Sequence, residues 1–489
     1  MQEDSTGAEE ERVQEGVERT GAGNTERTSK SAFCLFFVFG TSCWVTMNFV
    51  FAEVPLLIAQ SFPAVGDLLT VVVVCCVQAA NLAPLCIVLA SLLCHRHANE
   101  EKQPLILNTD QNDLTTSTTS NTTTTKDTRN TLGRRAVPVL LVLALNVACC
   151  AALAAVPQPM PLALFVALCT LAGLAATTSS VVLLPFGSLY PPAYTAAIAA
   201  GNTSSALVAG VLALVQQPGV RDRLSFAAAM GTATALAAAA LLAFVVLIAA
   251  PRYRALALPA SLHRARRVPA PSPAPATPKL SPAQGRRAVA AGAAQLFLQG
   301  FAENGVAMSV SAAALLPYGA HCFVAATACS FVAGPLAALL PSLLPPHTAA
   351  RALDSTPFVA ATTALYLAAA AYMGAIATLC RAPHGAPAPP LGLRAGAVAV
   401  CAARVAVRVL TQLGGVRAWT NLHGGGRRGP AIAPAQRMHA ARLGGLALQL
   451  GGLAGTAAAL LLALLAWAPA RHSSGSASSS LLFEPFSPA

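Results

Sequence analysis

Apolar segments long enough to cross a lipid bilayer recur along the whole of this 489-residue chain. A hydrocarbon core roughly 30 Å thick requires about 20 residues of helix, and about eleven segments reach that length. Only 10% of the residues are charged and 55% are hydrophobic, with a mean hydropathy of +0.60, which excludes an ordinary soluble protein. The sequence therefore predicts an all-α, multi-pass integral membrane protein.

The predicted helices form a group of six and a group of five, separated by a long polar segment. The predicted spans are 31–51, 66–94, 134–156, 162–187, 193–216, 225–250, 286–309, 317–343, 355–380, 391–413 and 438–468. The predicted domains are a disordered N-terminus (1–30), a six-helix bundle (31–250), a linker (251–285), a five-helix bundle (286–468) and a tail (469–489). Two bundles joined by a cytoplasmic loop are typical of transporters, in which they rock about a central site.

Lys and Arg residues concentrate in the loops on one side of these spans. They precede the first span and follow the second, sixth and tenth spans, whereas the opposite side has Arg221, Arg223, Arg381 and Arg471. Cytoplasmic loops carry such an excess, which predicts a cytoplasmic N-terminus and, with an odd number of spans, an extracellular C-terminus. The net charge of +12 then follows from membrane topology, and a nucleic-acid partner is not indicated.

Three polar segments of the chain are predicted not to fold on their own. Residues 1–30 lack the apolar core of a signal peptide, and the segments 108–131 and 268–283 are too polar or Pro-rich to fold alone. The 13 Cys residues lie mostly in apolar spans and are interpreted as small buried hydrophobes. Neither Cys nor His has metal-binding spacing, and the chain has no Ser/His/acid set or phosphate-binding loop. We therefore predict no enzyme activity, no cofactor, no metal site and no ATP hydrolysis.

The segment 39–55, FGTSCWVTMNFVFAEVP, places Trp44, Asn48 and Glu53 in an otherwise apolar span. A polar group in hydrocarbon costs several kcal/mol unless it is paired or faces a wet cavity, so these residues are candidates for a functional site. Alternatives stay open for each of them. Trp44 is equally suited to the core or the membrane interface, Asn48 to a helix–helix hydrogen bond, and Glu53 to simple solvation at the end of its helix.

A series of short motifs resembles the riboflavin transporters of solute carrier family 52. The first is a pattern of the form FGxxSW followed by Asn, an aromatic residue and Glu-Leu-Pro. It corresponds here to Phe39, Gly40, Trp44, Asn48, Phe51, Glu53 and Pro55, with Cys43 and Val54 in place of the Ser and the Leu. Further similar motifs follow in the same order: QAANLAPL (78–85), SSVVLLPF (179–186), ALVQQPG (213–219), ENGVAMSV (303–310), PYG (317–319), FVAGPLA (331–337), HGGGR (423–427) and LQLGGLAG (448–455).

This resemblance implies a plasma-membrane transporter that carries riboflavin into the cell by alternating access without ATP. It also implies a helix arrangement like that of the major facilitators or equilibrative nucleoside transporters. Riboflavin has a flat ring system with amide-like edges and a hydroxylated chain, which calls for aromatic faces and amide or carboxylate partners. The candidate substrate-binding residues are Trp44, Asn48, Glu53, Gln78, Phe186, Asn202, Asn304 and Gln449. For Asn304 a helix–helix hydrogen bond is the alternative, and for Asn81, beside Pro84, hydrogen bonding to freed helix carbonyls.

Several positions depart from the family pattern, mostly between residues 303 and 334. Glu303 replaces a Thr, Met308 a Pro, Ser311 a Gln, Val324 a His and Gly334 an Asn. If this region contacts the ligand, the substrate range has moved toward another flavin or a related heterocycle. A carrier of a nucleoside or a flavin phosphate is therefore one alternative function, and a polytopic receptor or membrane enzyme is another.

Arg404 and Arg408 lie one helical turn apart in the predicted span 391–413. Two guanidinium groups on one face of a helix do not face lipid. Pairing with Glu303 is the favoured interpretation, and exposure to a cavity or binding of an anionic substrate are the alternatives. Uncharged riboflavin does not account for them.

Overall fold

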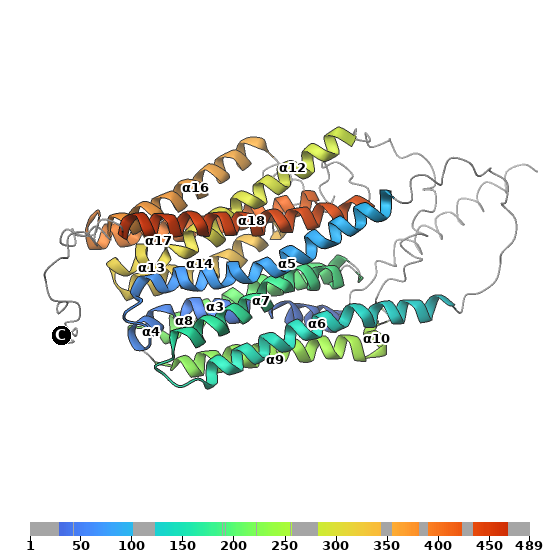
Figure 1. The fold of residues 1–489 in the computed structure, drawn as a ribbon, viewed down its shortest axis with the longest axis horizontal. Coiled ribbons are helices and arrows are strands. Elements are labelled where there is room, and N and C mark those ends of the chain that lie inside the picture. The colour runs from blue at the N-terminus through green and yellow to red at the C-terminus, as the bar shows by residue number, and fades with distance from the viewer. Residues whose placement is uncertain are drawn as a thin grey trace, which may run out of the picture.

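In the computed structural model the chain is a bundle of long helices (Figure 1). The structure describes residues 29–42, 44–100, 123–187, 189–190, 192–221, 223–254, 256, 282–343, 355–380, 390–422 and 434–467. All regular elements in these ranges are helical, which confirms the predicted all-α class. The predicted N-terminus up to residue 28, much of the predicted linker 251–285 and the predicted tail 469–489 lie outside the described residues.

The first half of the bundle begins with a helix that is broken twice. Its segments are α2 (Lys30–Gly40), α3 (Val45–Ala52) and α4 (Val54–Gln60). After a short turn, η1 (Gly66–Leu68), come α5 (Leu69–Glu100), α6 (Thr123–Ala155), α7 (Leu162–Gly187), α8 (Pro192–Gln216), α9 (Phe226–Ala249) and α10 (Pro251–Arg254). Part of the segment 108–131, predicted as too polar to fold alone, is helical. α6 already begins at Thr123, before the apolar run of the predicted span 134–156.

The second half also begins with an interrupted helix. α12 (Pro282–Gln299) continues into a π-helix, η3 (Gly300–Ala307), followed by α13 (Ser311–Leu315) and the short η4 (Leu316–Tyr318). The remaining helices are α14 (Ala320–Leu343), α16 (Thr356–Leu379), α17 (Gly392–Leu422) and α18 (Pro434–Trp467). Every predicted span is therefore helical.

Eight of these helices are long and apolar enough to cross a membrane, and the bent pair α2 and α3 makes a ninth if it is counted as one span. The chain is thus a multi-pass membrane protein. Two of the predicted spans, 286–309 and 391–413, are not among those that pass by length and composition. They correspond to α12 with η3 and to α17, whose charged residues Glu303, Arg404 and Arg408 lower their hydropathy.

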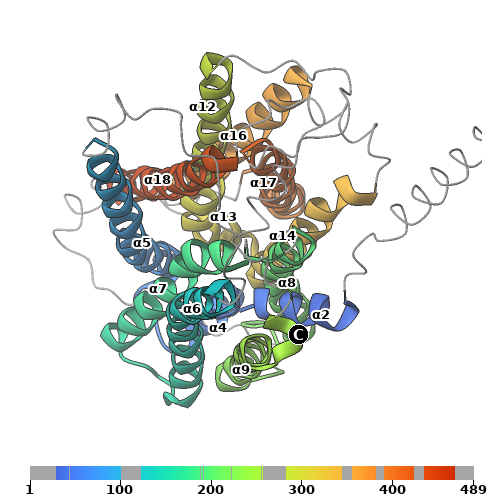
Figure 2. The same ribbon diagram turned by 90° about the vertical axis from the view of Figure 1, so that its right-hand side faces the viewer.

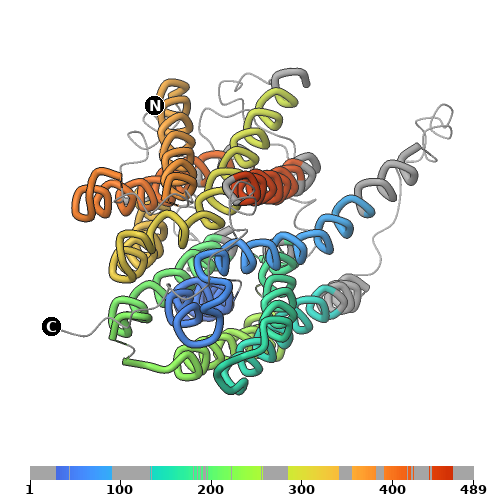
Figure 3. The backbone as a smooth tube through the Cα atoms, turned by 60° about the vertical axis from the view of Figure 1, so that its left-hand side comes forward, coloured from blue at the N-terminus to red at the C-terminus, as the bar shows by residue number. Residues whose placement is uncertain are grey.

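The two halves lie beside each other with their helices roughly parallel (Figures 2 and 3). Within the first half α2 packs against α8, and within the second half η3 packs against α18. The most extensive contacts between the halves are those of α14 with α8 and of α5 with α18. One early and one late helix of each half therefore form most of the interface.

Glycines bring the paired helices into backbone contact. A Cβ added at Gly201 would overlap the Phe37 carbonyl oxygen of α2, and one added at Gly455 would overlap the Phe301 carbonyl oxygen of η3. Small residues at membrane helix crossings allow such close approach, which replaces the hydrophobic driving force that is absent between helices in lipid. The glycines of the segment 444–455 therefore pack α18 closely against η3.

We expect Gly455→Ala to destabilise the protein by about 1–3 kcal/mol, because a methyl group has no room between α18 and η3. The matched control is Gly231→Ala on α9, where nothing lies within 4 Å of an added Cβ. Thermal unfolding of the purified protein in detergent measures both. Equal melting temperatures for the two variants would show that the close contact is not formed.

Candidate functional site

The break between α2 and α3 is held by side chains that bond to the backbone. Thr41 Oγ1 donates to the Val38 carbonyl (2.7 Å), and Ser42 Oγ donates to the Phe39 carbonyl (2.9 Å). Asn146 of α6 donates from Nδ2 to the Ser42 carbonyl at 2.7 Å. The two helical segments meet at 52°. A polar side chain from α6 thus replaces part of the hydrogen bonding that the break removes, and Asn146, an amide within an apolar span, was a signal that the sequence analysis missed.

Asn48 and Asn202 are brought together through Ser205. Asn48 Nδ2 donates to Ser205 Oγ (3.0 Å), and Ser205 Oγ donates to the carbonyl of Asn202 (2.8 Å). The Oδ1 atom of Asn202 is buried and has no hydrogen-bond partner within the described part of the chain. Trp44 lies half-buried one turn before Asn48, and the backbone N–H of Asn48 donates to the backbone carbonyl of Trp44 at 2.9 Å. Asn48 of α3 and the Asn202–Ser205 turn of α8 therefore form one polar group, which Trp44 joins only through the backbone of its own helix.

Gln78 of α5 and Asn304 of η3 approach Gly452 of α18 at the interface between the halves. A Cβ at Gly452 would lie 3.0 Å from Gln78 Nε2 and 3.5 Å from Asn304 Cβ. Gln449 precedes Gly452 by three residues and so shares its face of α18. Because Gly452 has no side chain, amides from α5 and η3 approach the same place on α18. The second polar group thus joins both halves.

Asn81 does not bond to helix carbonyls freed by Pro84, which corrects the expectation for this residue. Its Nδ2 instead donates to Gln78 Oε1 at 2.8 Å, one turn earlier on α5. This bond orients the Gln78 amide so that its Nε2 faces Gly452. Asn81 therefore positions a candidate residue.

Glu53 lies at the junction of α3 and α4 and is only 1% exposed, so simple solvation of this residue is wrong. Its Oε2 accepts a hydrogen bond from Gln216 Nε2 at 2.7 Å. The same Nε2 also approaches the Leu224 carbonyl (3.2 Å), in the segment between α8 and α9. Glu53 thus ties the break in the first helix to the end of α8.

Phe186 lies in a cluster of buried aromatic residues, against which the half-buried Trp44 also packs. Phe186 is 1% exposed, and its ring centroid is 5.0 Å from that of Phe244, 5.6 Å from that of Tyr190 and 6.3 Å from that of Phe39. Aromatic neighbours therefore surround its ring in this conformation. A stacking role for Phe186 stays a prediction.

The favoured interpretation of the two arginines is confirmed for Arg408 and wrong for Arg404. Arg408 Nη1 forms an ion pair with Glu303 Oε1, and Thr411 Oγ1 donates to Glu303 Oε2 at 2.6 Å. Arg404 points elsewhere, with Nη2 2.6 Å from Met308 Sδ. One turn of α17 separates the two side chains, so a single carboxylate on η3 is paired with only one of them.

Three of the departures from the family pattern meet at these arginines. Glu303 pairs with Arg408, Met308 contacts Arg404, and a Cβ at Gly334 would lie 2.6 Å from Arg408 Nε. An Asn at position 334 would thus collide with the arginine side chain. The residues at positions 303, 308 and 334 therefore all contact the two arginines of α17.

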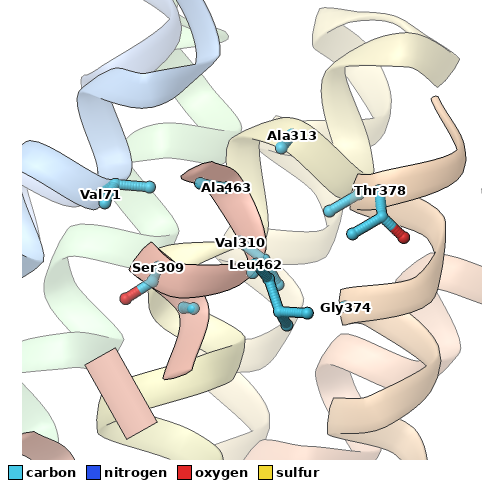
Figure 4. Close-up of a pocket in the computed structure, with 10 residues that line it drawn as sticks. Val71, Ser309, Val310, Ala313, Gly374, Thr378, Leu462 and Ala463 are labelled. Atoms are coloured by element: carbon cyan, nitrogen blue, oxygen red, sulfur yellow. The ribbon is translucent and has the colours of Figure 1, made fainter. Parts of the chain in front are cut away.

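A small cavity lies beside this region, between α5, α16 and α18 (Figure 4). Its volume is about 20 Å³, enough for about one water molecule. The lining is mostly apolar and includes Val71, Ser309, Gly374 and Thr378. None of the candidate substrate-binding residues lines it, and a tricyclic ring does not fit this cavity.

A family model described as solute carrier family 52, riboflavin transporter, matches residues 28–156. The match confirms the resemblance over these residues, which include Trp44, Asn48, Glu53 and Gln78. No curated protein matches the chain. Together, the family match and the membrane-length helices support a transporter.

We expect Arg408→Gln to lower the thermal stability strongly, because breaking a buried ion pair leaves a charge uncompensated at a cost of about 3–5 kcal/mol. Glu303→Gln, which leaves Arg408 without its carboxylate, is expected to cost about as much. The double variant Glu303→Gln/Arg408→Gln should lose less than the sum of the single losses, as measured by melting temperatures in detergent.

Arg394→Gln is the control for this cycle, since Arg394 is an exposed arginine on the same helix. Its melting temperature should stay close to that of the wild type. Strictly additive losses at positions 303 and 408 would contradict the ion pair.

Proposed function

We propose that this protein carries riboflavin across the plasma membrane into the cell by alternating access, without ATP hydrolysis. The observation that carries the proposal is the riboflavin-transporter match over residues 28–156, which contains four of the eight candidate residues.

The chemistry of the two polar groups is suited to this substrate. Amides of Asn48 and Asn202 in one group, and of Gln78, Asn304 and Gln449 in the other, offer both donors and acceptors to the ring edge and the hydroxylated chain. The unpartnered Asn202 Oδ1 is an acceptor that a ring N–H or a hydroxyl would satisfy. An analogue without the matching group would leave a buried amide unpaired, which is the basis of discrimination.

Alternating access is supported by the correspondence between the halves. In each half an interrupted first helix packs through glycines against a late helix, α2 with α8 and η3 with α18. The two pairs across the interface, α5 with α18 and α14 with α8, exchange under the same correspondence. This is the contact pattern of two repeats related by a pseudo-two-fold axis, and such repeats rock against each other around a site between them.

The topology belongs to the same proposal. Counting α12 with η3 and α17 as spans extends the nine apolar candidates to eleven, with a six-helix and a five-helix bundle. The excess of Lys and Arg places the N-terminus in the cytoplasm and the C-terminus outside. Glu53 then lies near the extracellular end of the first helix.

Uptake of labelled riboflavin in transport-deficient cells, with and without a pH gradient, tests the function. Uptake above that of vector controls is expected, and its absence despite surface expression would contradict the proposal. Competition by adenosine distinguishes a riboflavin carrier from a nucleoside carrier, which the same scaffold would also allow. Flux into proteoliposomes separates transport from binding by a receptor.

We expect Gln78→Leu to lower riboflavin uptake at least about tenfold, because the change removes an amide that is held in place by Asn81 and faces the other half. Uptake is measured at matched surface expression. Thr232→Val is the control, since Thr232 is exposed on α9 and its hydroxyl donates to the Ala228 carbonyl of its own helix. Equal uptake by both variants would exclude Gln78 from the substrate site.

Glu53→Gln is expected to lower uptake while surface expression stays intact. The amide oxygen still accepts from Gln216 Nε2, so folding is preserved, whereas the negative charge at the junction of α3 and α4 is lost. Wild-type uptake in Glu53→Gln would rule out a functional role for the carboxylate.

A further inference from the structure

The arginines of α17 bring more positive charge into the protein than the described residues neutralise. Arg404 is only 2% exposed, yet its Nε and Nη1 have no hydrogen-bond partner within the described residues. These two atoms carry three of the five N–H groups of a guanidinium. The remaining contact, from Nη2, is to the thioether of Met308.

A thioether does not compensate for this burial. Sulfur in methionine is a weak acceptor without charge, whereas a guanidinium keeps its positive charge in proteins. A buried charge without a partner costs several kcal/mol, and ionisable groups inside membrane proteins are a sign of a substrate or ion site. Arg404 therefore offers the hydrogen-bond donors and the positive charge that bind an anion.

The neighbouring carboxylate is already engaged. Both oxygens of Glu303 have partners, Oε1 in the ion pair with Arg408 and Oε2 in the hydrogen bond from Thr411. Two buried arginines and one glutamate leave one positive charge in this cluster. Glu53, a buried carboxylate of the first bundle, is bonded to Gln216 at the junction of α3 and α4. A single negative charge would balance the cluster.

The position of the cluster also points to function. Glu303 belongs to the π-helix η3, and Met308 is the C-cap residue of η3. π-helical turns are rare and occur frequently at functional sites, because they open the helix backbone locally. Asn304, next to Glu303, reaches Gly452 at the interface between the halves. The arginine cluster and the candidate substrate site thus share one helical segment.

We propose that Arg404 forms a subsite for one negatively charged group, a phosphate or a carboxylate, carried by the transported heterocycle. This inference rests on the proposed transport function and extends its substrate class from uncharged riboflavin to an anionic flavin or a similar ring compound. The anionic group accepts hydrogen bonds from Arg404 Nε and Nη1 and brings the cluster with Arg408 and Glu303 to neutrality. Arg404 binds the anionic group, and Arg408 holds Glu303 in its ion pair.

The test is equilibrium binding of labelled riboflavin to the purified full chain in detergent, with unlabelled riboflavin and riboflavin 5′-phosphate as competitors. The phosphate ester should compete about tenfold or more better than riboflavin, since a charge-assisted hydrogen bond is stronger than a neutral one. Arg404→Gln should abolish this preference, and Arg394→Gln should keep it. Glu303→Gln should increase the preference, because it leaves a further arginine uncompensated.

Melting temperatures provide a measurement that does not depend on riboflavin. Acetate or inorganic phosphate should raise the melting temperature of the wild type above that in the same buffer without the added salt, and the rise should be absent in Arg404→Gln. If this variant does not fold, Arg404→Lys replaces it; it retains the charge without the planar fork and should lose most of the preference for the phosphate ester.

Three results would overturn the subsite. They are equal competition by the two flavins in the wild type, a phosphate preference that survives in Arg404→Gln, and stabilisation by chloride that fully replaces the effect of acetate and phosphate. The last result would identify a resident inorganic ion. A wild type that neither binds nor takes up riboflavin contradicts the proposed function, whereas riboflavin uptake without phosphate preference contradicts only the subsite.

Discussion

Hydrocarbon offers no hydrogen-bond partners, so the polar side chains inside this protein must find partners on other helices. The ion pair of Glu303 with Arg408 is one such interaction. It connects the π-helix η3 to α17, and Thr411 donates a hydrogen bond to the second oxygen of the carboxylate. The same requirement connects Asn48 to Ser205 and Glu53 to Gln216. These bonds set which helices are neighbours and in which register they pack.

Glycine makes these polar contacts reachable. Backbone contact at Gly201 and Gly455 brings the first helix of each half against a late helix, and Gly452 leaves the space in which Gln78 and Asn304 approach α18. Gly334 does the same for the Arg408 side chain. Close crossings and polar bonds therefore depend on each other: without the glycines, side chains as short as Asn and Ser would not reach across.

Periodicity and length predicted the helices well, because a bilayer imposes the same length on each span. The predicted span 162–187 coincides with α7, and 193–216 differs from α8 by one residue. The prediction was less complete where polar groups interrupt the pattern. The π-helix at Gly300–Ala307 and the doubly broken first helix have no hydropathy signature, since their geometry depends on partners such as Asn146 that lie far along the chain.

The sequence by itself determined that the chain is a helical membrane protein, where its helices lie and which polar residues need a reason to be buried. Only the tertiary structure decided how those residues are partnered. It surrounded Phe186 with aromatic rings, paired Glu303 with Arg408 and left two nitrogens of Arg404 without a hydrogen-bond partner among the residues that the structure describes. The physical reason is that burial cost is a property of each residue, whereas compensation depends on the distance between helices, which no local pattern of residues encodes.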